Sequence, residues 1–167
     1  MSRRYGVMPG KVDDVEDPQA EGRVKVSFPR MGEGAQGYWA PVASVMGGKE
    51  RGAWIMPEVG DEVLVAFDEG DPEHPYVVGF LHNGDHRPPE TDPHIRLLHS
   101  VNGHVIALED PPITSGDRGG IRIEDAHGNL IELSNGRIVI RSVGQLELRA
   151  PTVVINGRVV APIPTPI

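Results

Sequence analysis

Four carboxylates and a histidine gather in the short segment DEGDPEH, which contains Asp68, Glu69, Asp71, Glu73 and His74. Paired carboxylates act as general acid and base only where their environments separate their pKa values. The glycine and proline of this segment are typical of a surface turn, which leaves carboxylates solvated. We therefore interpret the segment as a structural turn rather than as a calcium or catalytic site.

Histidine is the other residue type that would bind a metal, and the chain has seven, at positions 74, 82, 86, 94, 99, 104 and 127. His82 and His86 have the spacing of a zinc pair on a helix, but Asn83-Gly84 between them argues against a helix. In a trimer, one inward histidine per chain would meet its copies on the axis. His99, His104 and His127 are candidates for such a site, and we favour surface or turn roles for them.

Other catalytic patterns are missing from the sequence. There is no cysteine, so disulfides, thiolate metal sites and a cysteine nucleophile are excluded. The sequence has no G-x-S-x-G elbow, and its GEGAQG run lacks the Lys-Ser/Thr of a phosphate loop. Trp39 and Trp54 would serve as stacking platforms for nucleic acid or sugar, or as packing residues, which we favour. The sequence therefore predicts no catalytic, cofactor-binding or metal-ligating residue.

Composition points to an elongated β protein. Of the 167 residues, 21 are glycine and 16 are proline, which favours turns over helices. The net charge of −8 argues against nucleic-acid binding. No apolar run approaches the roughly 20 residues of a membrane helix. The N-terminal residues lack the apolar core of a signal peptide, so we expect synthesis in the cytoplasm without one.

The elements that hold these residues are short strands, most regular in residues 119–160. Apolar residues alternate there in five runs, Ile121/Ile123, Ile131/Leu133, Ile138/Ile140, Leu146/Leu148 and Val154/Ile155. Such alternation predicts strands with one buried and one wetted face. Strands this short cannot bury that face alone, and no helical pattern lies nearby to cover it. The sequence therefore predicts a stacked β-helix whose core is shared by several chains.

The rest of the chain divides into a barrel, a connector and a tail. Five strand-like runs separated by turn signals predict an OB-fold domain over residues 1–85. The runs are Val7 to Val15, Arg23 to Phe28, Tyr38 to Val45, Glu62 to Phe67 and Pro75 to Leu81. Residues 86–118 are expected to form a linker and a hairpin neck, with Asn102-Gly103 at its turn. Residues 119–160 are the β-helix spike. Residues 161–167 form a Pro-rich tip segment, because proline cannot continue a strand ladder.

Several of these segments resemble the OB domain of VgrG-type spike proteins, the central spikes of contractile phage tails, tailocins and type VI secretion systems. The resemblance rests on GRVKVSFP, YWAPVASV, GAW to VGDEVLV, DEGDP and PYVVGFLHNGD, in matching order. DAHGNLIEL, residues 125–133, is similar to the start of that family's β-prism. The resemblance implies an all-β homotrimer, with an OB barrel followed by an intertwined triple-stranded β-helix.

The resemblance also implies partners. Because the chain starts almost directly at the OB domain, it is similar to the phage baseplate assembly protein V type, whose hub is a separate protein. The expected partners are that hub, the tail tube by way of the hub, transiently the target membrane, and a PAAR-like tip protein. The predicted tip-binding residues are Pro162, Ile163, Pro164, Thr165, Pro166 and Ile167. The short linker leaves no room for an inserted lysozyme domain, and the His-x-His iron site of some phage spikes is absent.

The sequence thus predicts a non-enzymatic, membrane-puncturing spike at the centre of a baseplate, linking hub to tip. Such a protein would be assembled in a phage tail or tail-like particle and would leave the cell by lysis or ejection. Two alternatives stay open at this point. One is an OB-fold module that binds nucleic acid or polysaccharide, and the other is an enzyme acting on cell-wall polysaccharide.

Overall fold

A computed structural model describes residues 3, 5–31, 37–113 and 116–160. The described chain is all-β, as predicted, with short 3-10 helices at Pro29–Met31 and Asp68–Gly70. It divides into two compact units, Met1–Pro88 and Pro89–Ile167. No helix among the described residues has the length and apolarity that crossing a bilayer requires.

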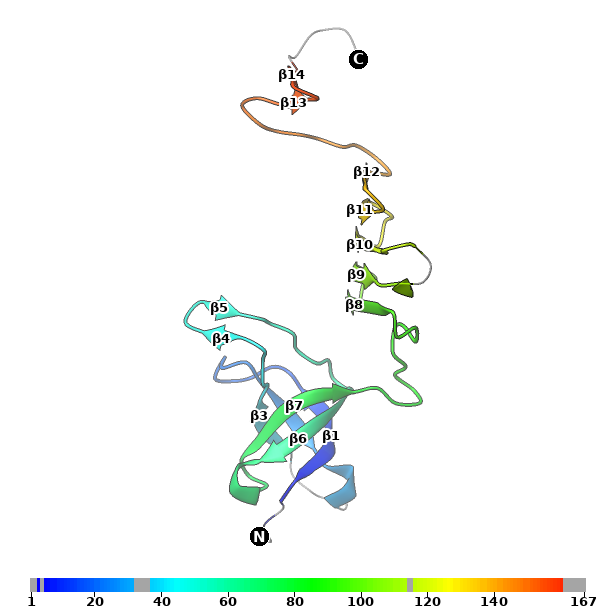
Figure 1. Cartoon of the computed structure of the whole chain (residues 1–167). Coiled ribbons are helices and arrows are strands. Elements are labelled where there is room, and N and C mark those ends of the chain that lie inside the picture. The colour runs from blue at the N-terminus through cyan, green and yellow to red at the C-terminus, as the bar shows by residue number, and fades with distance from the viewer. Residues whose placement is uncertain (1–2, 4, 32–36, 114–115, 161–167) are drawn as a thin grey trace. The chain divides into compact units, whose positions relative to one another are not determined.

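The first unit contains a five-stranded antiparallel sheet in the order β3-β2-β1-β6-β7 (Figure 1). Its strands are β1 (Val7–Asp14), β2 (Arg23–Ser27), β3 (Tyr38–Pro41), β6 (Glu62–Phe67) and β7 (Pro75–Leu81). A parallel bridge between Val42 and Val77 brings the two ends of the sheet together. Register shifts in β1 and between β6 and β7 provide the bends that a curled sheet needs. This half-barrel is consistent with the predicted OB domain.

The curled sheet encloses its own core. Alternate residues of its strands, and Phe28 directly after β2, point inward and are at most 1% exposed. The strand residues are Val12, Val24, Val26, Ala40, Val63, Val65 and Val77. Phe28 packs against Phe67 at a ring-centroid distance of 5.2 Å in a tilted arrangement. Burying one such side chain stabilises the fold by roughly 1.5–3 kcal/mol. The first unit is therefore held together by contacts within one chain.

A small hairpin extends from the first unit between β3 and β6. It consists of β4 (Gly47–Gly48) and β5 (Arg51–Gly52), which pair antiparallel. The sequence did not predict this hairpin, because two-residue strands rich in glycine have no apolar alternation. Predicted strand Tyr38 to Val45 accordingly ends earlier, at Pro41.

The second unit contains an antiparallel meander of five strands, stacked in chain order from β8 to β12 (Figure 1). These are β8 (Ile95–His99), β9 (Val105–Glu109), β10 (Gly120–Glu124), β11 (Leu130–Ser134) and β12 (Arg137–Arg141). Asn135 (φ 47°) and Gly136 (φ 77°) form the two-residue turn between β11 and β12. Positive φ at both positions is the requirement of a type I′ hairpin turn, which Asn-Gly meets.

Further along, β13 (Val154–Ile155) and β14 (Arg158–Val159) form a second small hairpin around Asn156-Gly157. The predicted neck hairpin, β8–β9, is continuous with the predicted β-helix strands, since β9 pairs with β10. Two further features differ from the sequence-based picture. The ladder hydrogen bonds of β8 to β12 lie within one chain rather than between chains, and the predicted run at Leu146/Leu148 forms no strand.

Candidate functional site

One face of the β8–β12 sheet is almost entirely aliphatic. Each strand has five residues, and the second and fourth of them point to this face. The pairing register aligns these positions in two columns across the sheet. We define the apolar face as Leu98, Ile106, Leu108, Ile121, Ile123, Ile131, Leu133, Ile138 and Ile140. Arg96 occupies the remaining position, and its guanidinium reaches Asp110 at 2.7 Å.

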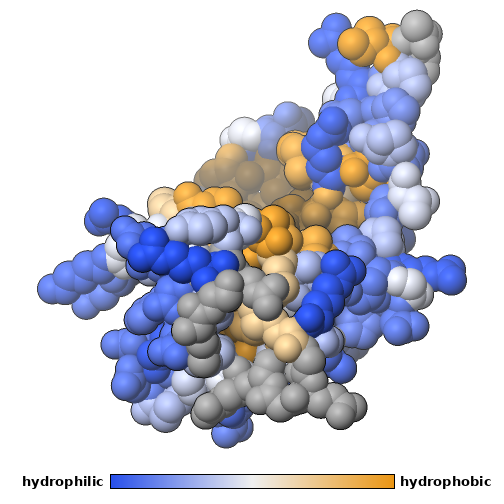
Figure 2. Space-filling model, turned by 90° about the horizontal axis from the view of Figure 1, so that it is seen from below, coloured by the Kyte–Doolittle hydropathy of each residue, from blue (hydrophilic) through white to orange (hydrophobic). Residues whose placement is uncertain are grey.

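The apolar face is uncovered in a single chain. Its nine side chains are between 39% and 69% exposed, whereas those of the barrel core are at most 1% exposed. Figure 2 shows apolar residues reaching the surface beside hydrophilic ones. A contiguous exposed aliphatic surface on a soluble protein marks an interaction site. The apolar face is therefore the strongest candidate for a functional surface on this chain.

The opposite face of the same sheet, which we call the polar face, carries every charged residue of these strands except Arg96. It also carries the aliphatic residues Ile95, Leu97, Val105, Ala107, Leu130 and Val139. Arg122 Nη1 donates to Glu124 Oε2 (2.6 Å), and its Nε donates to Glu109 Oε1 (3.3 Å). Ser134 Oγ lies 2.7 Å from Glu132 Oε1, to which it donates. On this face only Ala107, directly opposite Arg122 in the register, is fully buried. Because these groups remain half-exposed and mutually paired, this face is suited to water and the apolar face to an interface.

The loop between β10 and β11 is fixed by one carboxylate. Asp125 Oδ1 accepts hydrogen bonds from the amides of His127 and Asn129, and its Oδ2 accepts one from Asn129 Nδ2 (2.6 Å). These bonds, the Asn129 side chain first, lower the pKa of Asp125 below its usual range. Asn129 Oδ1 in turn accepts from the amide of Val143 (3.0 Å). The segment DAHGN thus ties the exit of β12 to the sheet.

The three histidines considered for an axial site lie away from the apolar face. His99 alternates with Leu98 and therefore points to the polar face. His104 lies in the β8–β9 loop, where its Nδ1 accepts from the amide of Ala126 (3.2 Å). His127 lies in the β10–β11 loop and is largely exposed. Among the described residues, no group of three or more His, Cys, Asp and Glu is arranged to hold a metal ion.

The acidic segment at residues 68–74 forms a turn, as interpreted from the sequence. Asp71 Oδ1 accepts from the amide of Glu73 (3.0 Å), and Asp71 Oδ2 lies 3.1 Å from His74 Nδ1. The Glu73 amide and then His74 lower the pKa of Asp71. A general acid at neutral pH needs a raised pKa instead. This carboxylate therefore builds the turn and is not poised for catalysis.

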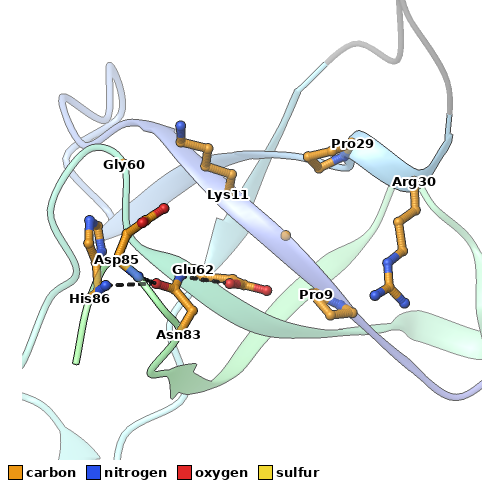
Figure 3. Close-up of a pocket in the computed structure, with 10 residues that line it drawn as sticks. Pro9, Lys11, Pro29, Arg30, Gly60, Glu62, Asn83, Asp85 and His86 are labelled. Carbon is orange, nitrogen blue, oxygen red and sulfur yellow. Dashed lines mark hydrogen bonds between the residues drawn. The ribbon is translucent and has the colours of Figure 1, made fainter. Parts of the chain in front are cut away.

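A polar hollow of about 320 Å³ lies beside β1 and β6 of the barrel (Figure 3). Glu62 Oε2, which faces it, accepts from Asn83 Nδ2 (2.9 Å). Asn83 Oδ1 accepts from the amides of Asp85 (2.9 Å) and His86 (2.7 Å). These bonds hold the turn that follows β7. The Glu62 and Asn83 side chains of this hollow therefore have a structural use.

Neither tryptophan belongs to the barrel core. Trp39 is half-buried, and the Arg23 guanidinium lies 5.9 Å from its ring centroid, in reach of a cation–π contact. Trp54 is 75% exposed and covers Gly22, where an added Cβ would come within 2.7 Å of the ring. Of the two packing roles that the sequence favours, in the core or between subunits, the structure excludes the core of one chain for Trp54.

The predicted tip-binding residues, Pro162, Ile163, Pro164, Thr165, Pro166 and Ile167, lie outside the described residues. Conversely, sequence reasoning left three residues of the apolar face in the neck, namely Leu98, Ile106 and Leu108. The signal that would have found them is the same spacing of apolar residues, at the second and fourth positions of VIALE, residues 105–109.

Comparison with known proteins agrees with this architecture. Residues 8–82 match the family model of the type VI secretion system/phage-baseplate injector OB domain. The chain is 47% identical over 111 residues to the type VI secretion system spike protein VgrG5 of Pseudomonas aeruginosa, covering 64% of this chain and 13% of the relative. It is 36% identical over 112 residues to VgrG1b of the same organism, covering 64% and 14%.

A third relative is the actin cross-linking toxin VgrG1 of Vibrio cholerae, 34% identical over 76 residues, which are 43% of this chain and 7% of the toxin. The chain thus spans less than a fifth of the length of each of these curated relatives. The OB-domain match over residues 8–82 contains the segments from GRVKVSFP to PYVVGFLH on which the predicted resemblance rests. The predicted resemblance to VgrG-type spike proteins is therefore confirmed, and residues 8–82 match the injector OB domain.

Proposed function

We propose that the protein is a structural spike of a type VI secretion system or phage baseplate, and that three copies pack their apolar faces together into a three-sided prism. The observation that carries this proposal is the apolar face itself. A single layer of strands with nine exposed aliphatic side chains on one side needs a cover. In a prism, each copy supplies one wall and the other two copies supply the cover.

The polar face supports the same arrangement. Its Arg122 cluster with Glu109 and Glu124 would decorate the outside of the prism. Pairs of opposite charge across strands contribute about 0.2–1 kcal/mol each. The core would be formed by six aliphatic side chains at most levels, two from each copy, with neighbouring levels about 4.8 Å apart. A solid aliphatic core and a charged exterior make a stiff rod.

The remaining parts of the proposal concern assembly. The OB barrel would contact a hub protein of the baseplate and, through it, the tail tube. Residues 161–167 would receive a PAAR-like tip protein, and the spike would touch the target membrane only during puncture. The part of the chain after β12 would continue as an intertwined β-helix. The particle would carry the protein out of the cell.

We also propose that this chain is not an enzyme. The cross-linking activity named for the Vibrio cholerae relative belongs to a protein of which this chain matches only 7%. Two carboxylates that would be candidates for chemistry, Glu62 and Asp71, are engaged in turn hydrogen bonds. Stiffness and resistance to unfolding are what a puncturing part requires.

Immunogold labelling of contractile particles from the producing cells tests the proposed role. The label should lie at the baseplate end of intact particles. Particles that assemble and contract normally in cells lacking the gene would contradict a spike function. Label along the sheath, with none at the baseplate, would contradict the proposed position.

A further inference from the structure

A hairpin arm extends from the barrel between β3 and β6 (Figure 1). We define the arm as residues 43–55, which contain β4 and β5. Ser44 Oγ donates to the carbonyl of Ala53 (2.8 Å), and the Ala53 amide donates to the carbonyl of Met46 (3.0 Å). At the base of the arm, the Ala43 amide donates to a carbonyl of β7 (2.8 Å). The arm is therefore folded and attached to the barrel within one chain.

The large apolar side chains of the arm are exposed. Val45 is 96% exposed, Met46 54%, Trp54 75% and Ile55 57%. Met46 and Trp54 also line a hollow of about 550 Å³ that reaches Val42 at the barrel. Contiguous exposed apolar surface marks an interaction site, and aromatic residues and methionine are enriched at interfaces. The packing role that remains for Trp54 is therefore one between subunits.

The barrel carries a second apolar surface on the outer side of β1, β6 and β7. We define the outer patch as Val7, Pro9, Leu64, Ala66 and Tyr76. The pairing register places Ala66 between Val7 and Tyr76, and places Pro9 beside Leu64. Val7 is 59% exposed and Tyr76 44%, and the other three are half-buried. Because alternate residues of β6 and β7 form the barrel core, the outer patch faces away from that core.

Unpaired charges of opposite sign lie beside the two surfaces. Lys49 and Arg51 of the arm are exposed, and so are Asp68, Glu69 and Glu73 of the β6–β7 turn, which borders the outer patch. Among the described residues, none of these five side chains forms a hydrogen bond or an ion pair. The arm has a net charge of +1, and the turn, residues 68–74, has one of −4 with its histidine neutral. The two surfaces are therefore complementary in both apolarity and charge.

The arm does not reach the outer patch of its own chain. Trp54 lies over Gly22, which is beyond the end of β1 because Asp14 of that strand pairs with Lys25. The outer patch begins at Val7, at the other end of β1. Eight residues of strand span roughly 26 Å, at about 3.3 Å per residue. Figure 1 accordingly shows the arm and the β6–β7 turn at opposite ends of the barrel.

We propose that the arm of one copy docks on the outer patch of a second copy of the chain. Met46, Trp54 and Ile55 cover the patch. Lys49 and Arg51 face the free carboxylates of the β6–β7 turn, so that complementary charge fixes the orientation of the contact. Because the arm is already folded, docking costs little conformational entropy.

The arm contact is separate from the apolar face of β8–β12. Each copy donates one arm and accepts one, which is a head-to-tail contact that forms a ring when it closes after three copies. The arm and the outer patch lie outside the barrel core, so the contact joins barrels without sharing that core. The barrels thereby gain an interface of their own.

Zero-length cross-linking tests the arm contact, because the chain has only three lysines, at positions 11, 25 and 49. A carbodiimide joins a lysine amine to an adjacent carboxylate as an amide, with loss of one water. Isotope-labelled and unlabelled full-length chains are unfolded and refolded together before cross-linking, and the linked peptides are identified by mass spectrometry. Lys49 should be joined to Asp68, Glu69 or Glu73, with labelled and unlabelled peptides joined to each other.

Lys11 provides the internal control, since it faces Glu62 in the pairing of β1 with β6. A link between these two residues should join only peptides with the same label. Lys49 linked to the turn only within one chain, or not linked to it at all, would overturn the arm contact.

Charge reversal provides a second test. Lys49→Glu/Arg51→Glu and Asp68→Lys/Glu69→Lys should each raise the concentration at which the trimer dissociates by roughly tenfold, because each opposes like charges across the contact. All four side chains are exposed, so the barrel should fold in both variants. The combination of the four substitutions should restore the original concentration. A combined variant that dissociates more readily than either double variant would contradict the pairing of arm and turn.

The arm contact rests on the proposed trimer, and the two fail in different ways. The native mass of the unmodified protein is measured in parallel. A trimer without interchain links from Lys49 retains the proposed prism and loses the arm contact. A monomer removes both.

Discussion

The two sheets of this protein share strand number and antiparallel pairing but differ in where their apolar residues are buried. The barrel sheet curls until its ends meet at Val42 and Val77, and eight of its residues become almost fully inaccessible. The β8–β12 sheet is an open meander, and only Ala107, on its polar face, is fully buried. The same alternation of apolar residues along the strands therefore forms a buried core within the first unit and an exposed apolar face in the second.

Connectivity explains the difference. In the barrel, β6 returns to pair with β1, so residues far apart in the sequence face each other across a core. In the meander, every strand pairs only with its sequence neighbours, and no other strand among the described residues pairs with this sheet or returns across its apolar side. A layer of this kind gains the hydrophobic stabilisation of burial only when another layer is supplied from outside. The stability of the barrel should therefore depend on contacts within one chain, and the stability of the β8–β12 sheet on contacts with further copies of the chain.

The largest expected effect is loss of association in Ile131→Asp, in the middle of the apolar face. A carboxylate in the aliphatic core of a trimer costs several kcal/mol per chain, because the cross-strand neighbours Ile123 and Ile140 offer it no cation. Sedimentation velocity should give a monomer, with the barrel still folded by tryptophan fluorescence. The matched control Val139→Asp, on the polar face, should remain associated. Trimeric Ile131→Asp would show that the apolar face is not the interface.

Phe28→Ala tests the opposite unit. Phe28 is 1% exposed and packs against Phe67, so its truncation should lower the free energy of unfolding of the barrel by about 3–5 kcal/mol. Urea unfolding followed by tryptophan fluorescence reports on this unit, since both tryptophans lie in residues 1–88. The loss should be the same at all protein concentrations. A loss that varies with concentration would show that the barrel core is shared.

The pH dependence of the barrel should rest in part on Asp17. Its carboxylate is 5% exposed, lies 2.7 Å from Arg23 Nη2, and accepts from the amides of Gln19, Glu21 and Arg23. The Arg23 side chain, before these amides, lowers the pKa of Asp17 well below its usual range. Stabilisation from this group is therefore present above the unfolded pKa of about 3.9 and is lost as pH falls below it.

In Asp17→Asn, the urea midpoint of the barrel should be lower at pH 7 and should change less between pH 7 and pH 3 than in the unmodified protein. Glu21→Gln, which alters a largely exposed partner of Arg23 at 3.6 Å, serves as the control. An unchanged pH profile in Asp17→Asn would show that this ion pair adds no stability to the barrel.

The smallest expected effect is that of Gly136→Ala in the β11–β12 turn. Its φ of 77° is unfavourable for a residue with a Cβ, so the substitution should cost about 1 kcal/mol. Thermal unfolding followed by circular dichroism measures it. Gly84→Ala should be nearly neutral, because φ of Gly84 is not positive and the added Cβ would find open space around it, with no contact within 4 Å. Equal effects of the two substitutions would argue against the type I′ turn.

Sequence reasoning reached most of the strands, because period-two alternation depends only on local geometry. All five barrel strands overlap the predicted runs, and the Asn102-Gly103 and Asn135-Gly136 turns lie between strands as turn chemistry requires. The β4–β5 hairpin was missed because glycine carries no pattern. The pairing of β8 to β12 within one chain was also missed, since alternation alone does not say which copy supplies the neighbouring strand.

The candidate site was predictable in part. The runs at Ile121/Ile123, Ile131/Leu133 and Ile138/Ile140 correctly indicated an apolar face, while Leu98 and Ile106 were assigned to a neck because polar linker residues precede them. Leu146 and Leu148 have strand spacing but no strand, because a ladder needs a partner that the chain itself does not supply. The predicted division at residues 118 and 119 and the tip segment remain predictions.

The most direct test of this account is the mass of the intact protein in solution, measured by multi-angle light scattering over a range of concentrations. The account predicts three chains of 18.1 kDa each, about 54 kDa in total, at every concentration at which the copies bury their apolar faces against one another. A mass of 18.1 kDa throughout, with the β8–β12 sheet folded, would contradict the proposal that three copies share one core.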